Sequence, residues 1–378
     1  MYARLLIPPK QKSFFLFGPR GTGKTTWAKS TFPNAPYIDL LESDIFTDLL
    51  ARPQRLENYI PEKNTDFVII DEIQRVPELL HEVHRLIETE HRKFILTGSS
   101  ARKLRKKGQN LLAGRALTYY FHPLTVTEVG HDFDLTRSIQ YGQLPSVYHE
   151  ENRKKYLESY VKTYLEEEIS QEGLTRNLSA FARFLETASF SQGSLLNTSE
   201  IARESAIKRK VVENYFTILE DLLIGYRLPS FQKKTKRRLT AHPKFYFFDV
   251  GVYRTLRPTG PMDMPEMVEG TAFESLFFQD LLAVNDGLGL GYKLFYYRTA
   301  LGTEVDFICY GEKGIRAFEV KRTDKLSSGT LKGLRSFAKE YPESKNYLVY
   351  GGKKTMRDGN INIMPINEAL KHLPELLS

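Results

Sequence analysis

A glycine-rich stretch, GPRGTGKTT at residues 18–26, constrains the fold of this chain more than any other feature. It follows a short apolar run at 12–17 and leads into TWAKSTF, which is typical of a helix start. Strand, glycine loop and helix N-terminus are the context that the motif G-x-x-x-x-G-K-[ST] requires. Backbone N–H groups of such a loop surround phosphates, and the helix end adds a partial positive charge. The stretch predicts an α/β nucleotide-binding domain; the alternative is a glycine turn with a chance lysine.

Two side chains of this loop have distinct expected roles. Lys24 is expected to reach the β- and γ-phosphates, and the Thr25 hydroxyl is expected to ligate Mg²⁺. The predicted cofactors are therefore ATP and Mg²⁺. The expected nucleotide contacts are the loop and the first helical residues: Gly18, Pro19, Arg20, Gly21, Thr22, Gly23, Lys24, Thr25 and Thr26.

Two further apolar runs end in polar residues. The run at 66–70 ends at Asp71-Glu72, and the run at 93–97 leads to Ser99. Asp71 is expected to hold Mg²⁺ through water, and Glu72 is expected to orient or deprotonate the attacking water. Because ligands lie at the carboxyl ends of parallel strands, Ser99 is expected beside the γ-phosphate. In the alternative, the two acids cap a helix and Ser99 is a turn residue.

Three stretches, FVIIDEIQRVPELL, ILTGSSARKL and LLAGRALTYYFHPLTVTEV, resemble the AAA-type P-loop ATPases of bacteria and archaea that carry a C-terminal domain of unknown function. The resemblance covers nearly the whole chain. It implies that Ser99 is the sensor residue and that Arg115 is an arginine finger or a γ-phosphate contact. YGQLPSVY resembles the Gly-Pro loop of related switch-type ATPases, which implies that Gly142 and Pro145 lie near the catalytic base. In the alternative, Arg115 is a surface cation and Pro145 is a turn residue.

The middle of the chain has the pattern of a small helical module. Tyrosines at helical spacing in the run 151–172 predict a connector helix. Beyond it, the expected elements are a helix at 180–189, a short helix capped by Thr198 or Ser199, a longer helix after residue 207, and a hairpin of 227–231 with 244–248. Two helices joined by a tight turn and followed by a hairpin are typical of a winged helix-turn-helix.

Basic residues concentrate in this module. Residues 208–238 include nine basic and three acidic residues, which is +6 of the chain's net charge of +8. Such a concentration is expected where a protein neutralises phosphates. The predicted DNA contacts lie at the start of the longer helix and in the loop between the two strands of the hairpin, which is the wing of this motif. They are Lys208, Arg209, Lys210, Lys233, Lys234, Lys236, Arg237 and Arg238. Because wings are polar loops and winged helices also pack against proteins, a protein-packing module is the alternative.

The stretch GTEVDFICYGEKGIRAFEVKR at 302–322 predicts a β-hairpin. A turn at its Gly-Glu-Lys-Gly places Asp306 across from Glu319 and Glu304 across from Lys321, all on one face because strand side chains alternate. Two opposed carboxylates repel each other, and a divalent metal would reverse that interaction. The alternative is a salt-bridged face with Glu304 on Lys321 and Asp306 solvated. The opposite face is expected to be the buried one and holds Val305, Phe307, Cys309, Phe318 and Val320.

Asp followed by Glu-x-Lys on the next strand resembles the core of the PD-(D/E)xK nucleases. The resemblance implies an acid on a preceding helix, which Glu274 in VEGTAFESLFFQDLLA matches, and a following helix, which TLKGLRSFAKEY matches. Asp306 and Glu319 would then be metal ligands, and Lys321 would steady a phosphate or the attacking water. The implied catalytic residues of the whole chain are Lys24, Glu72, Ser99, Arg115, Glu274, Asp306, Glu319 and Lys321.

These features predict an α/β fold in four parts: an AAA-type P-loop NTPase domain with a parallel sheet (1–150), a helical linker (151–178), a winged helix-turn-helix (179–258) and an α/β PD-(D/E)xK nuclease-like domain (259–378). The predicted function is Mg²⁺-dependent ATP hydrolysis that controls DNA binding and metal-dependent cleavage. One alternative is a switch ATPase that binds nucleic acid or a regulatory protein without cleavage; another is a C-terminal domain for self-association. An arginine finger acting between chains would make the protein a homo-oligomer.

The expected location is the cytoplasm. The sequence has no run of about 18 apolar residues that could span a bilayer, and its N-terminus lacks the apolar region of a signal peptide. Its only cysteine, Cys309, excludes an internal disulfide framework and thiolate zinc sites, and fits a reducing compartment.

Overall fold

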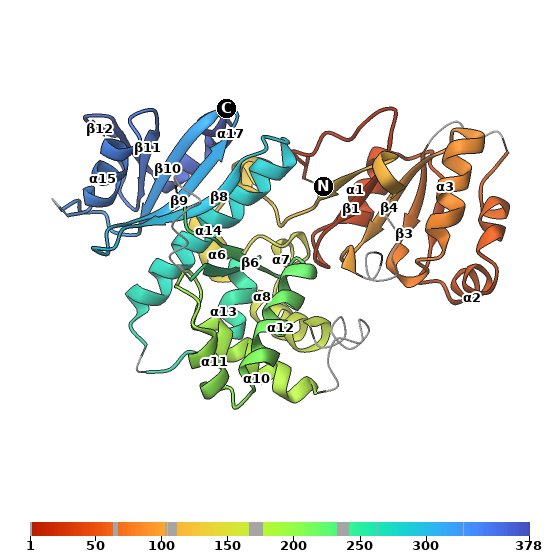
Figure 1. Cartoon of the computed structure of the whole chain (residues 1–378), viewed down its shortest axis with the longest axis horizontal. Coiled ribbons are helices and arrows are strands. Elements are labelled where there is room, and N and C mark those ends of the chain that lie inside the picture. The colour runs from red at the N-terminus through yellow and green to blue at the C-terminus, as the bar shows by residue number, and fades with distance from the viewer. Residues whose placement is uncertain are drawn as a thin grey trace. The chain divides into compact units, whose positions relative to one another are not determined.

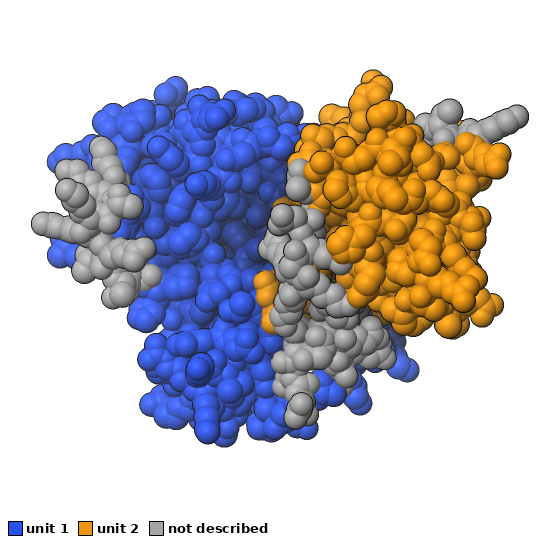
Figure 2. Space-filling view, turned by 45° about the vertical axis from the view of Figure 1, so that its right-hand side comes forward, with its two compact units in different colours: residues 1–5, 123–220, 224–378 blue, residues 6–122, 221–223 orange. Residues whose placement is uncertain are grey.

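The computed structural model describes residues 2–62, 67–102, 104, 112–165, 177–232, 242–261, 263–327 and 329–378. The chain divides into two compact units, which Figure 2 colours separately. Unit 2 holds Leu6–His122 and Asp221–Leu223, and unit 1 holds Met1–Leu5, Pro123–Glu220 and Ile224–Ser378. None of the described helices is long and apolar enough to cross a membrane.

Unit 2 is built on a parallel five-stranded sheet with the strand order β2-β3-β4-β1-β5 (Figure 1). Its strands are β1 (Ser13–Phe17), β2 (Tyr37–Asp39), β3 (Phe67–Asp71), β4 (Lys93–Gly98) and β5 (Ala116–Tyr120). Its α-helices are α1 (Lys24–Thr31), α2 (Ser43–Ala51) and α3 (Leu79–Glu90), and shorter 3-10 turns cover Pro53–Tyr59, Ile73–Arg75 and Leu112–Gly114. The predicted parallel α/β domain is thus present.

Helices cover both faces of this sheet, which explains why its strands are continuous apolar runs. Phe15 and Phe17 of β1 pack in one cluster with Val83 of α3. Phe14, one position along the strand, packs in a second cluster with Trp27 of α1. Successive side chains of a strand point to opposite faces, so the two clusters lie on the two sides of the sheet.

Unit 1 begins with short helices and continues as the helical module predicted from the sequence. The first helices are α5 (Val126–Val129), α6 (Leu135–Tyr141), α7 (Pro145–Tyr148) and α8 (Arg153–Ser159), followed by a π-helical stretch at Tyr160–Leu165. The module contains α10 (Leu178–Ser189), α11 (Thr198–Glu204), α12 (Arg209–Asp221), the antiparallel pair β6 (Gly225–Leu228) and β7 (Lys244–Phe247), and α13 (Val250–Leu256).

Two details of this module differ from the sequence prediction. The cap of α11 is Asn197, whose side chain accepts a hydrogen bond from the Glu200 N–H, so Thr198 and Ser199 are already helical. The hairpin begins at Gly225, two positions earlier than predicted, and its strands end at Leu228 and Phe247. The end of the connector helix prediction and all the wing residues lie outside the described residues.

The C-terminal part of unit 1 is a mixed six-stranded sheet with the order β12-β13-β11-β10-β9-β8 (Figure 1). Its elements are α14 (Pro265–Gly287), β8 (Lys293–Arg298), β9 (Glu304–Gly311), β10 (Gly314–Lys321), α15 (Lys332–Glu340), β11 (Lys345–Tyr350), β12 (Met356–Asp358), β13 (Ile361–Pro365), α16 (Ile366–Lys371) and α17 (Leu373–Leu377). Helix α14 packs through Phe277 against Phe318, with ring centroids 5.2 Å apart. Helix α15 joins the other face through Leu334 and Phe337.

Buried hydrogen bonds tie the segment after β5 to the C-terminal helices. The Val126 N–H donates to Asp280 on α14 at 2.8 Å, and the Gln143 N–H donates to Asp249 at the start of α13 at 2.9 Å. Residues 123–150 therefore belong to unit 1. The compact division falls at His122, whereas the sequence placed a domain boundary at residue 150.

Candidate functional site

The phosphate-loop residues occupy the carboxyl end of β1. Gly21 and Gly23 have positive φ angles of 81° and 87°, a conformation that side chains disfavour. A Cβ at Gly18 would lie 2.2 Å from the Phe121 carbonyl oxygen, so the loop has no room for a side chain there. The ammonium of Lys24 donates to the carbonyl oxygen of Gly18 at 2.6 Å, and Thr25 and Thr26 form the first turn of α1.

Asp71 is the centre of a buried hydroxyl cluster at the carboxyl end of β3. One carboxylate oxygen accepts hydrogen bonds from the Thr25 hydroxyl at 2.8 Å and from the Tyr37 hydroxyl at 2.6 Å. The other oxygen accepts from the Thr97 hydroxyl. Burial, together with hydrogen bonding to Asp71, raises the pKa of Tyr37. The sequence predicted Thr25 and Asp71 at this place and missed Tyr37.

These oxygens fit a magnesium ion in chemistry. Mg²⁺ prefers hard oxygen ligands and is commonly held by one or two carboxylates or hydroxyls plus the phosphates of the nucleotide. Thr25 and Asp71 already meet within hydrogen-bonding distance, 2.8 Å. The two predicted magnesium residues of the ATPase domain are therefore brought together.

Glu72, Gln74 and Ser99 form a second chain of contacts beside this cluster. Gln74 donates through its amide nitrogen to the Glu72 carboxylate and, at 3.3 Å, to the Ser99 hydroxyl. Glu72 has φ 59°, in the left-handed region, and its side chain makes no capping hydrogen bond in the described structure. The Gly18 N–H donates to the Gly98 carbonyl at 3.3 Å, which joins the phosphate loop to the strand that precedes Ser99. Sequence reasoning missed Gln74.

The remaining two predicted contacts lie in different surroundings. The Arg115 guanidinium forms an ion pair with Glu88 of α3, which lowers the pKa of that carboxyl group. Pro145 is the first residue of α7 in unit 1, and Gly142, with φ 72°, ends α6 against Asp249. The roles of Arg115 and Pro145 beside a nucleotide stay predictions.

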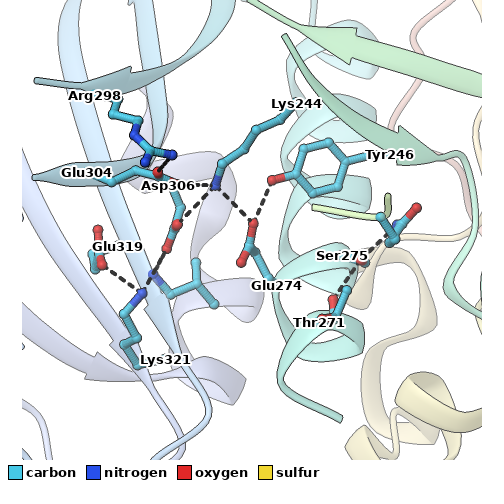
Figure 3. Close-up of polar contacts among 12 residues, drawn as sticks. Lys244, Tyr246, Thr271, Glu274, Ser275, Arg298, Glu304, Asp306, Glu319 and Lys321 are labelled. Atoms are coloured by element: carbon cyan, nitrogen blue, oxygen red, sulfur yellow. Dashed lines mark hydrogen bonds and ion pairs between the residues drawn. The ribbon is translucent and has the colours of Figure 1, made fainter. Parts of the chain in front are cut away.

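In unit 1 the predicted nuclease-like residues gather in one cluster (Figure 3). Lys321 of β10 forms ion pairs with Glu319 at 2.7 Å and with Asp306 of β9 at 3.5 Å. The Val320 N–H donates to the Asp306 carboxylate at 2.9 Å. Glu274 of α14 joins through Lys244 rather than directly, since the Lys244 ammonium lies 3.5 Å from Glu274 and 3.4 Å from Asp306.

The hairpin register agrees with the prediction at each paired position from Gly311–Gly314 to Phe307–Phe318. The pairing ends there, one position before Asp306 and Glu319, so these two acids are not a cross-strand pair. The Asp306 side chain binds the Val320 N–H at this point. Beyond it, β10 pairs with β11 only, and the strands separate where the cluster forms.

The predicted faces of the hairpin are wrong in one respect. Between Phe295–Ile308 and Tyr297–Val305 the β8–β9 pairing shifts, because β9 has one extra residue there, a β-bulge. Val305 consequently packs with Ile308 in the cluster under α15, on the face opposite Phe307. Both faces of the sheet are buried, not one.

The salt-bridged alternative for this hairpin is wrong as well. Glu304 pairs with Lys244 at 2.6 Å and with Arg298 at 3.4 Å, whereas Lys321 pairs with Glu319 and Asp306. Asp306 is not solvated, because only 4% of it is exposed.

Burial sets the protonation of this cluster. It raises the pKa of Glu274 to about 7 and that of Glu319 to about 8, and the charge of Asp306 adds to both shifts. Burial alone would raise the pKa of Asp306 too, but the ammonium groups of Lys244 and Lys321 hold it below its usual value. One Glu319 oxygen is buried without a hydrogen-bond partner among the described residues. Strong pKa shifts of this kind are typical of functional sites.

The predicted metal ligands Asp306 and Glu319 are bridged by Lys321 in this arrangement. Within the described ranges, no group of three or more His, Cys, Asp or Glu residues is arranged to hold a metal ion. In this cluster, sequence reasoning missed Lys244. The available signal was a lysine at the start of the otherwise apolar run KFYFF.

A groove of about 940 Å³ opens at the carboxyl ends of β10 and β11. Glu269 and Phe273 of α14 line it, as do Arg322 and Thr323, which follow Lys321 directly. Arg322 forms an ion pair with Glu269 across the groove. Residues of α14, which carries Glu274, and residues that follow β10, which carries Lys321, therefore line the groove.

Of the predicted DNA contacts, three are in the described part of the chain. Lys208, Arg209 and Lys210 are exposed at the N-terminus of α12, and Arg209 forms an ion pair with Glu213 at 2.8 Å. The five wing residues lie outside the described residues: Lys233, Lys234, Lys236, Arg237 and Arg238.

Comparisons with known families agree with the ATPase fold and leave the rest unassigned. Residues 10–130 match a family model described as an AAA domain. Residues 132–263 and 269–369 match two models, each described as a domain of unknown function, DUF8612 and DUF4143. The first match agrees with the parallel sheet and the phosphate loop, so residues 10–130 have the fold of an AAA-type P-loop domain.

Two curated relatives are similar over most of the chain. They are uncharacterized proteins of Mycobacterium bovis and Mycobacterium tuberculosis, each 25% identical over 345 residues, which cover 89% of this chain and 76% of theirs.

Solved structures give weaker matches. A signal-transduction ATPase with numerous domains and a tetratricopeptide repeat sensor, from Pyrococcus horikoshii, is 15% identical with a TM-score of 0.22, over 77% of this chain and 49% of that one. A Vibrio cholerae protein is 10% identical with a TM-score of 0.24, over 87% and 94%. At these scores neither structure supports an inference.

Proposed function

We propose that the protein is an Mg²⁺-dependent ATPase that works as a nucleotide-controlled switch on nucleic acid. The ATPase proposal rests on the contact between Thr25 and Asp71, which joins the phosphate loop to the acidic end of β3. When bound, Mg²⁺ would neutralise charge on the transferred phosphate. Thr25 and Asp71 would hold the ion, Lys24 would bind the phosphates, and Glu72 would accept the proton of the attacking water.

The first experiment measures phosphate release from ATP with and without Mg²⁺. Lys24→Ala should abolish hydrolysis, and Glu72→Gln should lower kcat about a hundredfold or more, since it removes a general base. Lys10→Ala, at an exposed lysine outside the loop, is the control and should hydrolyse ATP as the wild type does. Hydrolysis that persists in Lys24→Ala would overturn the nucleotide assignments.

The nucleic-acid part of the proposal rests on the exposed basic residues at the start of α12. Phosphate contacts release counterions, so affinity falls with salt in proportion to the number of contacts. We expect the combined variant K208A/R209A/K210A to bind duplex DNA more weakly and to lower the salt slope by about 3. Fluorescence anisotropy over a salt series measures both.

The matched control for this triple variant is K353A/K354A/R357A, which removes three exposed basic side chains elsewhere in unit 1. An equal loss of DNA affinity in both triple variants would mean that the effect comes from net charge alone. Binding that does not respond to salt, or no binding at low salt, would remove nucleic acid from the proposal and leave a regulatory protein as the partner.

A second candidate function is cleavage of nucleic acid by the C-terminal domain. It is favoured by the convergence of Glu274, Asp306, Glu319 and Lys321, each with a counterpart in the PD-(D/E)xK pattern (Figure 3). The helix that carries Glu274 and the residues that directly follow Lys321 also contribute to the lining of the groove. The test incubates DNA and RNA of several shapes with Mn²⁺ or Mg²⁺ and ATP. Cleavage should disappear in Asp306→Asn and persist in Asp358→Asn, a substitution at an exposed acid of β12. If every substrate stays intact, the switch without cleavage remains.

A further inference from the structure

Lys244 is the cation around which three carboxylates of unit 1 are arranged. Its ammonium lies 2.6 Å from Glu304, 3.4 Å from Asp306 and 3.5 Å from Glu274 (Figure 3). The three acids come from two elements that are far from β7 in the sequence, namely α14 and β9. One nitrogen on β7 thus joins one carboxylate from a helix and two from another strand.

Backbone pairing on both sides of β7 fixes the position of Lys244. Lys244 pairs with Leu228 of β6 on one side and forms an isolated bridge with Leu195 on the other. Only 4% of the Lys244 side chain is exposed. A buried ammonium without partners is strongly disfavoured, so the carboxylates are required to keep the lysine charged.

The same position is the one that a divalent metal bound by these acids would need. Mg²⁺ requires about six oxygen ligands near 2.1 Å, and Mn²⁺ has similar demands. An ammonium in contact with all three carboxylates occupies the inward-facing lone pairs and repels a second cation. Lys321 occupies the neighbouring position between Asp306 and Glu319 in the same way. The residues as they lie do not fit a metal ion.

We propose that Lys244 is the built-in cation of this cluster and that it excludes divalent metal from the site formed by Glu274, Glu304 and Asp306. The protein therefore holds Mn²⁺ there only after the positive charge at residue 244 is removed. This inference bears on the second candidate function and leaves the ATPase proposal unaffected. Metal-dependent cleavage would need a state in which the Lys244 ammonium has left the acids.

The test is Mn²⁺ binding to the nucleotide-free full-length chain, followed by electron paramagnetic resonance of the free ion. The Mn²⁺ binding of the wild type should be the same as that of Asp306→Asn, because the wild type holds no Mn²⁺ at this cluster. Lys244→Met, which keeps an apolar stem of similar length, should gain a site at least about tenfold tighter than any in the wild type. Adding Asp306→Asn to Lys244→Met should abolish the gain.

Two further variants keep the outcome decisive. Lys244→Ala removes both the charge and the apolar stem, and it replaces Lys244→Met in the test if circular dichroism shows that Lys244→Met is misfolded. Lys293→Ala, at an exposed lysine of β8, is the control and should bind Mn²⁺ as the wild type does. The inference is overturned if wild type holds Mn²⁺ in a manner that depends on Asp306. It is also overturned if both folded Lys244 variants bind no more tightly than wild type. Neither result depends on whether the protein cleaves nucleic acid.

Discussion

Gln74 is the side chain that connects the expected base of the ATPase with the expected sensor. Its amide nitrogen donates to the Glu72 carboxylate and to the Ser99 hydroxyl. Gln74 is 5% exposed, and its amide oxygen has no hydrogen-bond partner among the described residues. A buried polar atom without a partner is costly, so this oxygen is available to a nucleotide-bound water or another donor. We infer that Gln74 positions Glu72.

Replacing Gln74 by alanine should lower kcat by about tenfold to a hundredfold, because a hydrogen bond to a charged group contributes about 1.5–3 kcal/mol. The KM for ATP should stay near the wild-type value, since Gln74 is not among the expected phosphate contacts. Steady-state kinetics measure both constants. Gln54→Ala, at an exposed glutamine of unit 2, is the control. An unchanged kcat in Gln74→Ala would show that Glu72 is positioned by other groups.

Asp249 is a second buried polar residue with a measurable consequence. Its carboxylate caps α13 by accepting from the Val252 N–H at 3.0 Å, and it also accepts from the Gln143 N–H at 2.9 Å. It is fully buried, and burial raises the pKa of Asp249 to about 6 despite these hydrogen bonds. The folded protein therefore binds the Asp249 proton more tightly than the unfolded chain does.

This shift fixes the sign of a pH effect. Stability from the Asp249 proton is complete below the unfolded pKa near 3.8 and is lost as pH rises through about 6. Asp249→Asn cannot lose that proton. The stability of Asp249→Asn relative to wild type should therefore increase by up to about 3 kcal/mol between pH 4 and pH 7. Urea unfolding by circular dichroism measures it, and a pH-independent difference would contradict the assignment.

At the scale of elements, the hairpin of β9 and β10 shows which features of a strand pair a sequence pattern predicts and which it does not. Its register was predictable because the turn and the alternation of apolar side chains fix the pairing. The bulge at Asp306 and Phe307 was not, because it depends on the pairing of β9 with β8. That local choice turns Val305 to the other face and separates the strands at the acidic cluster. Pattern reasoning thus located the acids of the cluster and Lys321, but neither Lys244 nor the ion pairs that these acids form.

Helix α13 packs against α6 at a distance that only glycine permits. A Cβ on Gly251 would lie 2.1 Å from the carbonyl oxygen of Tyr141. Gly251→Ala should therefore destabilise unit 1 by about 1–3 kcal/mol, the usual range for overpacking. Gly270 of α14 has nothing within 4 Å of a Cβ position, so Gly270→Ala should instead stabilise the helix by about 0.5–1 kcal/mol.

The Cys309 thiol provides the readout for this pair. It is the only thiol of the chain, is fully buried in unit 1, and becomes reactive when that unit unfolds. The urea concentration at which the thiol reacts should fall for Gly251→Ala and rise for Gly270→Ala. Equal midpoints for both variants would mean that the contact with Tyr141 relaxes without cost.

At the scale of the whole molecule, the sequence predicted the ATPase domain because its motif is local and its strands are apolar runs. The contact of Lys244 with Asp306 could not be predicted, since it joins residues 62 positions apart. Tyr37 meets Asp71 through the pairing of β2 with β3, and only the strand order reveals that neighbourhood. The residues that were missed are therefore those whose role depends on packing between distant segments.

The two units each contain a natural reporter, which allows the switch proposal to be tested on the intact chain. Trp27 is the only tryptophan, lies in α1 next to the phosphate loop, and packs on Phe14 and Phe121 in unit 2. We expect its fluorescence to respond to nucleotide binding. Cys309 reports on unit 1, because burial both hides the thiol and raises its pKa, so that an aromatic disulfide reagent reacts only after opening.

A switch requires that the nucleotide changes the free energy of unit 1 and not of unit 2 alone. With Mg²⁺ and a non-hydrolysable ATP analogue, the reaction rate of Cys309 should change about fivefold or more, as for a coupling free energy of at least about 1 kcal/mol. Lys24→Ala should show neither this change nor a Trp27 response. If Trp27 responds in the wild type while the Cys309 rate stays constant, the nucleotide binds without controlling unit 1. The ATPase would then stand, and the switch would not.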